Sequence, residues 1–330
     1  MKKKLLRAAA ALMAAVLLTG CSGGESSSSG GGPVNIAPAA KEVTPPFWVV
    51  EDADTGGTLY LLGSMHAGVE GVQYPDYVME AYRACDTVAA ELDTVAVQQD
   101  TEALIEATQC LLLQGTTAKE VMGEDLYNRA VEFMTGKGTY FPAMDMYIPF
   151  YWASSLSQLL MTDAGLSAAY GTEAIFLESA HTDGKTVVEI ESAAEQYGMM
   201  AGIPMEMQLY TLETSIGDAN YQMQVASMLA LYNAWSSFDT QYLGSLNADG
   251  SVLLPEELKE SYGIYWDMMY CDRQVKMAEK AVELLKSGED VFMFVGAAHF
   301  YIEDDLITLI EREGYTVEEI RGAALEEKAA

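Results

Sequence analysis

The chain has 330 residues, half of them hydrophobic, so it is long and apolar enough to bury one large core. It carries 49 acidic against 18 basic residues, a formal net charge of −31. Charge of this sign excludes nucleic acid as a partner, because its phosphates would be repelled. It also disfavours adsorption to an anionic membrane surface, except through a covalent anchor.

The amino-terminal region predicts secretion. Residues 1–20 combine a positively charged start with the short apolar run AAAALMAAVLL. The following LTGC is similar to a bacterial lipobox, which implies cleavage before Cys21 and a lipid on its thiol; an ordinary signal peptide with an incidental cysteine is the alternative. Residues 21–45 read as a Ser/Gly-rich tether. We expect an extracytoplasmic lipoprotein anchored in the cell membrane, with its domain over 46–322 and a tail at 323–330.

The other cysteines do not form a disulfide framework. Cys85, Cys110 and Cys271 are odd in number and irregularly spaced. They are interpreted as small buried hydrophobic residues, and one disulfide among them stays open.

The amino-terminal part of the domain predicts strands. Residues 47–51 and 58–62 are apolar and β-branched, and the DADTGG between them can form a tight turn. A helix is expected at 76–84, after a proline, and a third strand at 87–92.

The middle of the chain, about 98–285, turns helical. Residues 147–161 are apolar but too short and too interrupted for a membrane span, so we expect a buried helix. Another helix is expected to start near Thr172, and a strand at 186–190.

The carboxyl-terminal part predicts strands again. In chain order we expect a helix at 269–287, a strand at 291–295, a helix at 303–313 and an edge strand at 315–320. The fold class is therefore α/β, with a mixed sheet built from both ends of the chain and a large helical insertion between them.

An apolar strand followed by Gly-x-x-His occurs twice, in TLYLLGSMH and in VFMFVGAAH. Strands without polar alternation are typical of parallel sheets, whose ligand crevice lies beyond the carboxyl ends of the strands. Gly63 and Gly296 can let the backbone leave each strand sharply. His66 and His299, two of only three histidines, would then meet in a metal site. Two imidazoles and a carboxylate suit Mn, Co, Fe or Zn.

Three glutamates are candidates for the carboxylate. Glu91, near the exit of a strand in the same half of the sheet as His66, is the first choice as a ligand, because a charge in an apolar strand is costly unless paired or metal-bound. Glu173 follows a glycine at a helix start, where it could simply favour the helix dipole. Glu191 could hold a histidine tautomer by contacting a ligand rather than the metal, or it could be a surface acid. Ser64 is a second candidate for such a supporting contact.

Arg273 is the one basic residue of interest. It lies off the apolar stripe expected for its helix, so solvent exposure is its default. It could instead clamp a substrate carboxylate or stabilise an oxyanion. The expected stripe consists of Cys271, Val275, Ala278, Val282 and Leu285. The third histidine, His181, is expected in an exposed loop.

Four segments together resemble the TraB/GumN family, which includes the Tiki proteases. They are FWVVEDADTGGTLYLLGSMHAGVEGVQYP, TVAAELD, DRQVKMAEKAVELLKSGEDVFMFVGAAHF and GYTVEEI. The resemblance runs from about residue 47 to 320 and is weak in the helical middle. It implies a metal-dependent peptidase: Tiki proteins use Mn or Co to clip a secreted ligand near its amino terminus, and TraB acts against a peptide pheromone.

The resemblance also implies site residues. By this resemblance His66, His299 and Glu91 are the metal ligands. Glu173 corresponds to the acid that follows glycine in YGTE, and Glu191 corresponds to the EIES motif. The family usually has Arg-Asn where this chain has Arg273 followed by glutamine.

Together these observations predict a metal-dependent hydrolase acting on peptides. A metal-activated water would attack the scissile carbonyl, Glu173 or a neighbouring acid would handle the proton, and Arg273 would steady the developing charge. Two alternatives stay open: a surface lipoprotein that sequesters a peptide without cleaving it, and haem capture by the two histidines.

Overall fold

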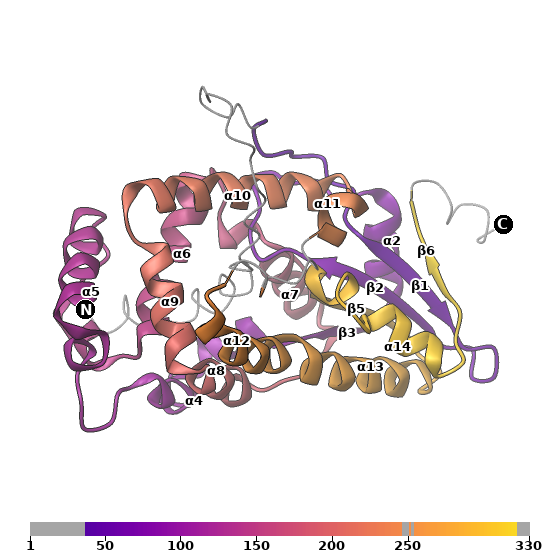
Figure 1. The fold of residues 1–330 in the computed structure, drawn as a ribbon. Coiled ribbons are helices and arrows are strands. Elements are labelled where there is room, and N and C mark those ends of the chain that lie inside the picture. The colour runs from indigo at the N-terminus through magenta and orange to yellow at the C-terminus, as the bar shows by residue number, and fades with distance from the viewer. Residues whose placement is uncertain (1–36, 246–250, 252–253, 322–330) are drawn as a thin grey trace.

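The computed structural model describes residues 37–245, 251 and 254–321 (Figure 1). The predicted signal segment, Cys21, the tail and most of the predicted tether lie outside these residues. Packing against the domain begins before residue 46, since Val43 is buried and the Thr44 amide donates to the Ser236 carbonyl at 2.6 Å. Within the described part, no helix has the length and apolar character needed to cross a membrane.

A six-stranded mixed sheet forms the core, as predicted, in the order β4-β3-β5-β2-β1-β6. Strands β4, β3, β5 and β2 are mutually parallel, whereas β1 is antiparallel to both of its neighbours. The central strand β5 comes from the carboxyl-terminal part of the chain. The strands are β1 (Phe47–Glu51), β2 (Thr58–Ser64), β3 (Thr87–Ala90), β4 (Thr186–Glu189), β5 (Asp290–Gly296) and β6 (Val317–Glu319).

Helices cover both faces of the sheet (Figure 1). Because β5 has apolar residues on both of its faces, it must be buried on both. Its Val291 and Met293 pack with α13 (Asp272–Leu285) and α14 (Leu306–Arg312), and its Phe292 packs with α2 (Asp76–Ala84) and α7 (Thr172–Asp183).

Most of the remaining helices form a second region beside the sheet, which extends to the left in Figure 1. Its core surrounds Trp152 on α6, the predicted buried helix, most of whose residues are buried. The predicted insertion also supplies strand β4. The helices are α3 (Thr94–Gln99), α4 (Thr101–Thr108), α5 (Ala118–Gly136), α6 (Pro149–Asp163), α8 (Ala193–Gly202), α9 (Met205–Ser215), α10 (Asp218–Ser236), α11 (Thr240–Ser245) and α12 (Lys259–Trp266).

The hairpin between β1 and β2 forms as predicted, but its two glycines serve different purposes. Gly56 has φ +80°, a conformation that glycine adopts at little cost. Gly57 is needed for space, because a Cβ there would lie 2.4 Å from the Leu285 carbonyl oxygen.

The cysteine prediction is correct for one residue of three. Cys85 is buried, Cys271 is partly buried and Cys110 is exposed. All three thiols are free, so no disulfide forms among them.

Candidate active site at the carboxyl ends of the parallel strands

Each of the four parallel strands is followed by one predicted site residue. His66 follows β2, His299 follows β5, Glu91 follows β3 and Glu191 follows β4. Carboxyl ends of parallel strands lie at the same edge of a sheet. Pairing also continues past the strands, since the Glu191 amide donates to the Glu91 carbonyl at 2.8 Å. The topology therefore brings residues more than 200 positions apart to one edge.

The two Gly-x-x-His turns are in contact. A Cβ on Gly63 would lie 3.3 Å from the Cα of Ala297, in the turn that carries His299. The chain leaves β5 at Gly296, as expected, although without a positive φ, and the 3₁₀ turn begins at the next residue. At Gly63 the expectation is wrong, because β2 continues to Ser64. A side chain at Gly63 would crowd Pro46, at 3.2 Å, and the neighbouring turn, at 3.3 Å.

His66 lies against a carboxylate from α7, one of the helices that cover the sheet. Its Nδ1 is 2.9 Å from Oε1 of Glu173, and Ser64 Oγ donates to that same oxygen at 2.6 Å. Burial lowers the pKa of His66, but the Glu173 charge outweighs it, and the net pKa is raised. Glu173 itself has a lowered pKa, because this contact overcomes its burial.

Glycines explain how α7 comes so close to His66. A Cβ on Gly171 would lie 2.5 Å from the His66 carbonyl oxygen, and a Cβ on Gly68 would lie 2.0 Å from that of Tyr170. Glu173 follows in the first turn of α7. The bare backbone at these two glycines thus places Glu173 beside the imidazole.

His299 has different surroundings. It is buried within the 3₁₀ turn Ala297–Phe300, 5.8 Å from the ring centroid of Tyr270. Among the described residues neither ring nitrogen has a hydrogen-bond partner. Burial, reinforced by the Arg273 charge, lowers the pKa of His299 to about 3, so the ring is neutral.

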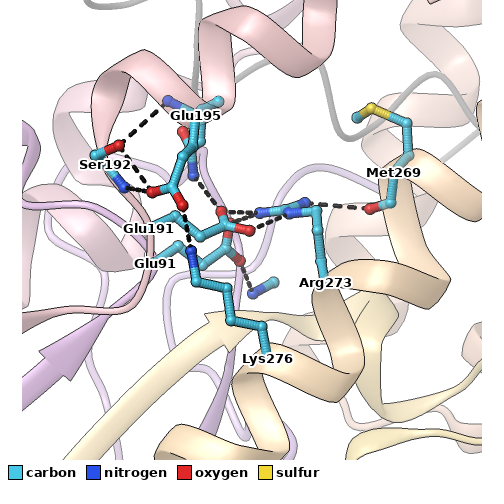
Figure 2. A network of polar contacts seen from close by, with 9 residues as sticks. Glu91, Glu191, Ser192, Glu195, Met269, Arg273 and Lys276 are labelled. Atoms are coloured by element: carbon cyan, nitrogen blue, oxygen red, sulfur yellow. Dashed lines mark hydrogen bonds and ion pairs between the residues drawn. The ribbon is translucent and has the colours of Figure 1, made fainter.

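Glu91 and Glu191 share one guanidinium (Figure 2). Arg273 donates from Nε and Nη2 to the two oxygens of Glu191, both at 2.7 Å, and from Nη2 to Oε2 of Glu91 at 2.5 Å. The other oxygen of Glu91 accepts from the Gly296 amide at 2.7 Å. Burial raises the pKa of Glu91, but Arg273 outweighs burial and holds that pKa well below its usual range.

Solvent exposure, the default expectation for Arg273, is therefore wrong: 5% of the residue is exposed. The expected apolar stripe is correct at Ala278, Val282 and Leu285, which are buried, and wrong at Val275, which is 50% exposed. The face that is buried recurs every three or four residues and includes the arginine. It consists of Arg273, Gln274, Met277, Ala278, Ala281, Val282 and Leu285.

Other predicted residues have partners that differ from expectation. Glu191 contacts Arg273 and accepts from Gln196 Nε2 at 2.8 Å, so it does not hold a histidine tautomer. His181 lies in α7 rather than in a loop, with its Nε2 2.7 Å from Asp93. Sequence reasoning missed Gln196 entirely.

A pocket opens beside the buried Glu191–Arg273 pair. Two flexible methionines and several charged groups line it, among them Lys276 and Glu195, which are 2.6 Å apart (Figure 2). Its lining consists of Glu191, Glu195, Gln196, Met199, Met268, Asp272, Arg273 and Lys276.

Metal binding by His66, Glu91 and His299 stays a prediction. In the part of the chain described, no three His, Cys, Asp or Glu side chains are arranged to hold a metal ion. Glu91 has protein partners on both oxygens. By contrast, Nε2 of His66, both ring nitrogens of His299 and Oε2 of Glu173 are buried with no hydrogen-bond partner among the described atoms.

The fold and this edge define an α/β protein with a buried cluster of histidines and charged residues at the carboxyl ends of its parallel strands. The model of the TraB/PrgY/gumN family matches residues 46–319, most of the chain. The protein therefore belongs to this family. No curated protein and no solved structure matches the sequence.

Proposed function

We propose that this protein is a metal-dependent hydrolase that acts on peptides, with His66 and His299 as metal ligands. The observation that carries the proposal is the set of buried, unpartnered donor atoms on these histidines and on Glu173. A buried polar atom without a partner costs about 1–3 kcal/mol. A cation bound by these atoms would remove that cost. The peptide substrate is inferred from the family resemblance.

The charge balance of the site supports the same proposal. Three carboxylates at this edge, those of Glu91, Glu173 and Glu191, lie in or beside the buried cluster, and among the described residues Arg273 is its only guanidinium. Protonation of His66 offsets at most one of the remaining negative charges. Uncompensated buried charge is costly, so these residues fit a divalent cation.

We assign roles as follows. His66 and His299 hold the metal with Glu91 or Glu173 as the carboxylate; Mn, Co, Fe or Zn bound there would supply an activated water and polarise a carbonyl. Glu173 keeps one oxygen on Ser64 and has the other free to accept a proton. Arg273 holds Glu91 in place, and its action on a developing negative charge stays part of the proposal.

Metal analysis of the purified protein tests the ligands. We expect a stoichiometric divalent metal in the wild type and its loss in His66→Ala and in His299→Ala. His181→Ala is the matched control, because His181 is the only other histidine and contacts Asp93. Retention of metal by both site variants would contradict the assignment.

A peptide library tests the reaction. We expect cleavage that requires Mn or Co, stops with EDTA and is lost in His66→Ala. Tight peptide binding without cleavage and indifferent to EDTA would favour a sequestering protein instead, and a Soret band on purification would favour haem.

We also propose attachment to the extracytoplasmic face of the cell membrane through lipid on Cys21, on the strength of the LTGC sequence. Cys21→Ser should move the protein from the membrane to the soluble fraction. A variant that stays in the membrane fraction would contradict this.

A further inference from the structure

A continuous chain of hydrogen bonds links helix α8 to the end of strand β5 (Figure 2). It runs from Gln196 to Glu191 at 2.8 Å, and from Arg273 to Glu191 at 2.7 Å. It continues from Arg273 to Glu91 at 2.5 Å and ends with the Gly296 amide on Glu91 at 2.7 Å. The four side chains are all buried. The chain therefore joins elements that are distant in sequence without passing through solvent.

The Arg273 guanidinium binds the carboxylates of Glu191 and Glu91 with different geometries. Arg273 presents its Nε and Nη2 donors as a fork to Glu191 and a single Nη2 bond to Glu91. A fork on a carboxylate is the stronger geometry. Because Glu191 occupies the fork, Glu91 keeps one oxygen for the Gly296 amide. If the Glu191 charge is removed, we expect the fork to turn to Glu91 and to draw Oε1 away from the Gly296 amide.

The hydrogen bond from the Gly296 amide to Glu91 lies next to the turn that carries His299. Gly296 ends β5 and directly precedes the Ala297–Phe300 turn that carries His299. In the described structure, neither nitrogen of the His299 ring has a hydrogen-bond partner. The position of the His299 ring thus depends on packing and on the backbone of the turn. Glu91 binds the amide of Gly296, the residue directly before this turn.

We propose that Glu191 and Gln196 are positioning residues. They act through Arg273 to keep one oxygen of Glu91 on the Gly296 amide, and so fix the turn that presents His299. The consequence for metal binding rests on the proposed function, but the hydrogen-bond chain itself can be measured without metal.

Amide hydrogen exchange of the metal-free full chain, read by NMR, is the first test. In Glu191→Gln we expect the Gly296 amide to exchange at least about tenfold faster, while the amides of the β1–β2 pairing keep their wild-type rates. Glu195→Gln is the matched control: it lines the same pocket but is exposed and pairs with Lys276. Unchanged exchange at Gly296 in Glu191→Gln, or equal acceleration in Glu195→Gln, would overturn the proposal.

A milder variant keeps the test informative if Glu191→Gln folds poorly. Gln196→Leu removes only the outermost hydrogen bond of the chain and leaves every charge in place. We expect a smaller acceleration at Gly296, in the same direction. No acceleration there in a folded Gln196→Leu protein would remove Gln196 from the proposal.

A double-mutant cycle tests whether Glu191 acts through Arg273. Arg273→Lys keeps the charge but lacks the planar fork, so it should accelerate Gly296 exchange by itself. Adding Glu191→Gln should then have little further effect, because the fork that Glu191 occupies is already gone. Additive effects would show that Glu191 acts independently of Arg273 and would overturn the proposed route.

Metal titration separates this proposal from the proposed function. With Mn²⁺ or Co²⁺ as the probe, we expect Glu191→Gln to bind about tenfold more weakly, the usual scale for residues that support ligands, and Glu195→Gln to match the wild type. Equal affinity in Glu191→Gln would overturn the positioning role. A wild type that binds no metal would defeat the proposed function alone, because Gly296 exchange still decides the hydrogen-bond chain.

Discussion

The two Gly-x-x-His turns have the same sequence pattern and leave neighbouring strands, yet the protein supports them in different ways. His66 lies directly against a carboxylate, Glu173, which α7 supplies. The His299 ring lacks a hydrogen-bond partner within the described structure. It depends on the backbone of its turn, and Glu91 accepts a hydrogen bond from the Gly296 amide directly before that turn. A repeated motif can thus give two imidazoles opposite electrostatic environments. The difference comes from two helices of the insertion: α7 supplies Glu173 beside His66, and α13 supplies Arg273, which reinforces the effect of burial in lowering the pKa of His299.

The largest expected effect tests the indirect support of the His299 turn. Arg273→Met leaves Glu91 and Glu191 buried without their cation, and breaking a buried ion pair in this way costs about 3–5 kcal/mol. Urea unfolding of the metal-free protein measures it. Lys276→Met, one turn further along α13, removes only an exposed partner of Glu195 and should cost less than about 1 kcal/mol. Similar losses of unfolding free energy in both variants would contradict the expectation that the buried ion pair contributes more than the exposed one.

The next effect tests the direct support of the His66 turn. In Gly171→Ala the new Cβ would meet the His66 carbonyl oxygen at 2.5 Å, so the turn must shift, at a cost of about 1–3 kcal/mol. Gly198→Ala is the control: it lies inside α8 with nothing within 4 Å of the new Cβ, and it should stabilise the protein by up to about 1 kcal/mol. Thermal or urea unfolding gives both signs. A neutral Gly171→Ala would contradict the close approach.

Replacement of each histidine by leucine should give opposite signs in the metal-free protein. His66→Leu takes from Glu173 its contact with the ring Nδ1 at 2.9 Å and should destabilise by about 1–3 kcal/mol. His299→Leu removes two buried nitrogens that have no partner in the described part of the chain, and should stabilise by about 1 kcal/mol. The comparison uses denaturant midpoints at one pH. Equal destabilisation by both substitutions would mean that the two rings are equally well supported.

The smallest effect concerns the segment that follows the His299 turn. Gln274 Nε2 donates to the Asp304 carbonyl at 2.5 Å, and Asp304 has φ +51°. Gln274→Leu removes this hydrogen bond, at a cost of about 0.5–1.5 kcal/mol. Amide exchange should accelerate around residue 304 and stay unchanged at the His66 turn. Acceleration at both turns would show that the two are coupled through their contact.

Much of the fold could be predicted, because apolar strands and their glycines are local signals. The sheet, the buried helix at 147–161 and the start of α7 at Thr172 all follow from such patterns. The meeting of His66 and His299 at one edge follows from the carboxyl-end rule for parallel strands. What failed was the environment of charged residues, which depends on segments distant in sequence.

Arg273 illustrates the difficulty. It begins a series with a spacing of four that continues through Met277, Ala281 and Leu285, and this spacing is visible in the sequence. A charged residue on an apolar stripe nevertheless favours placing the stripe elsewhere. The burial of Arg273 is compensated by the two glutamates at the ends of β3 and β4 and by the Met269 carbonyl, which accepts from Nη1 at 3.3 Å. Likewise, Glu173 looked like a helix-dipole acid because the contact of Gly171 with His66 could not be inferred from spacing.

The position of β5 has a consequence for how the chain matures. Until residue 296 leaves the ribosome, β2 and β3 have no central neighbour, and each presents an unpaired apolar edge. Such edges attract other chains, and long-range parallel pairing is slow to form. The candidate catalytic edge is therefore assembled only when β5 pairs with both β2 and β3, late in the order of the chain.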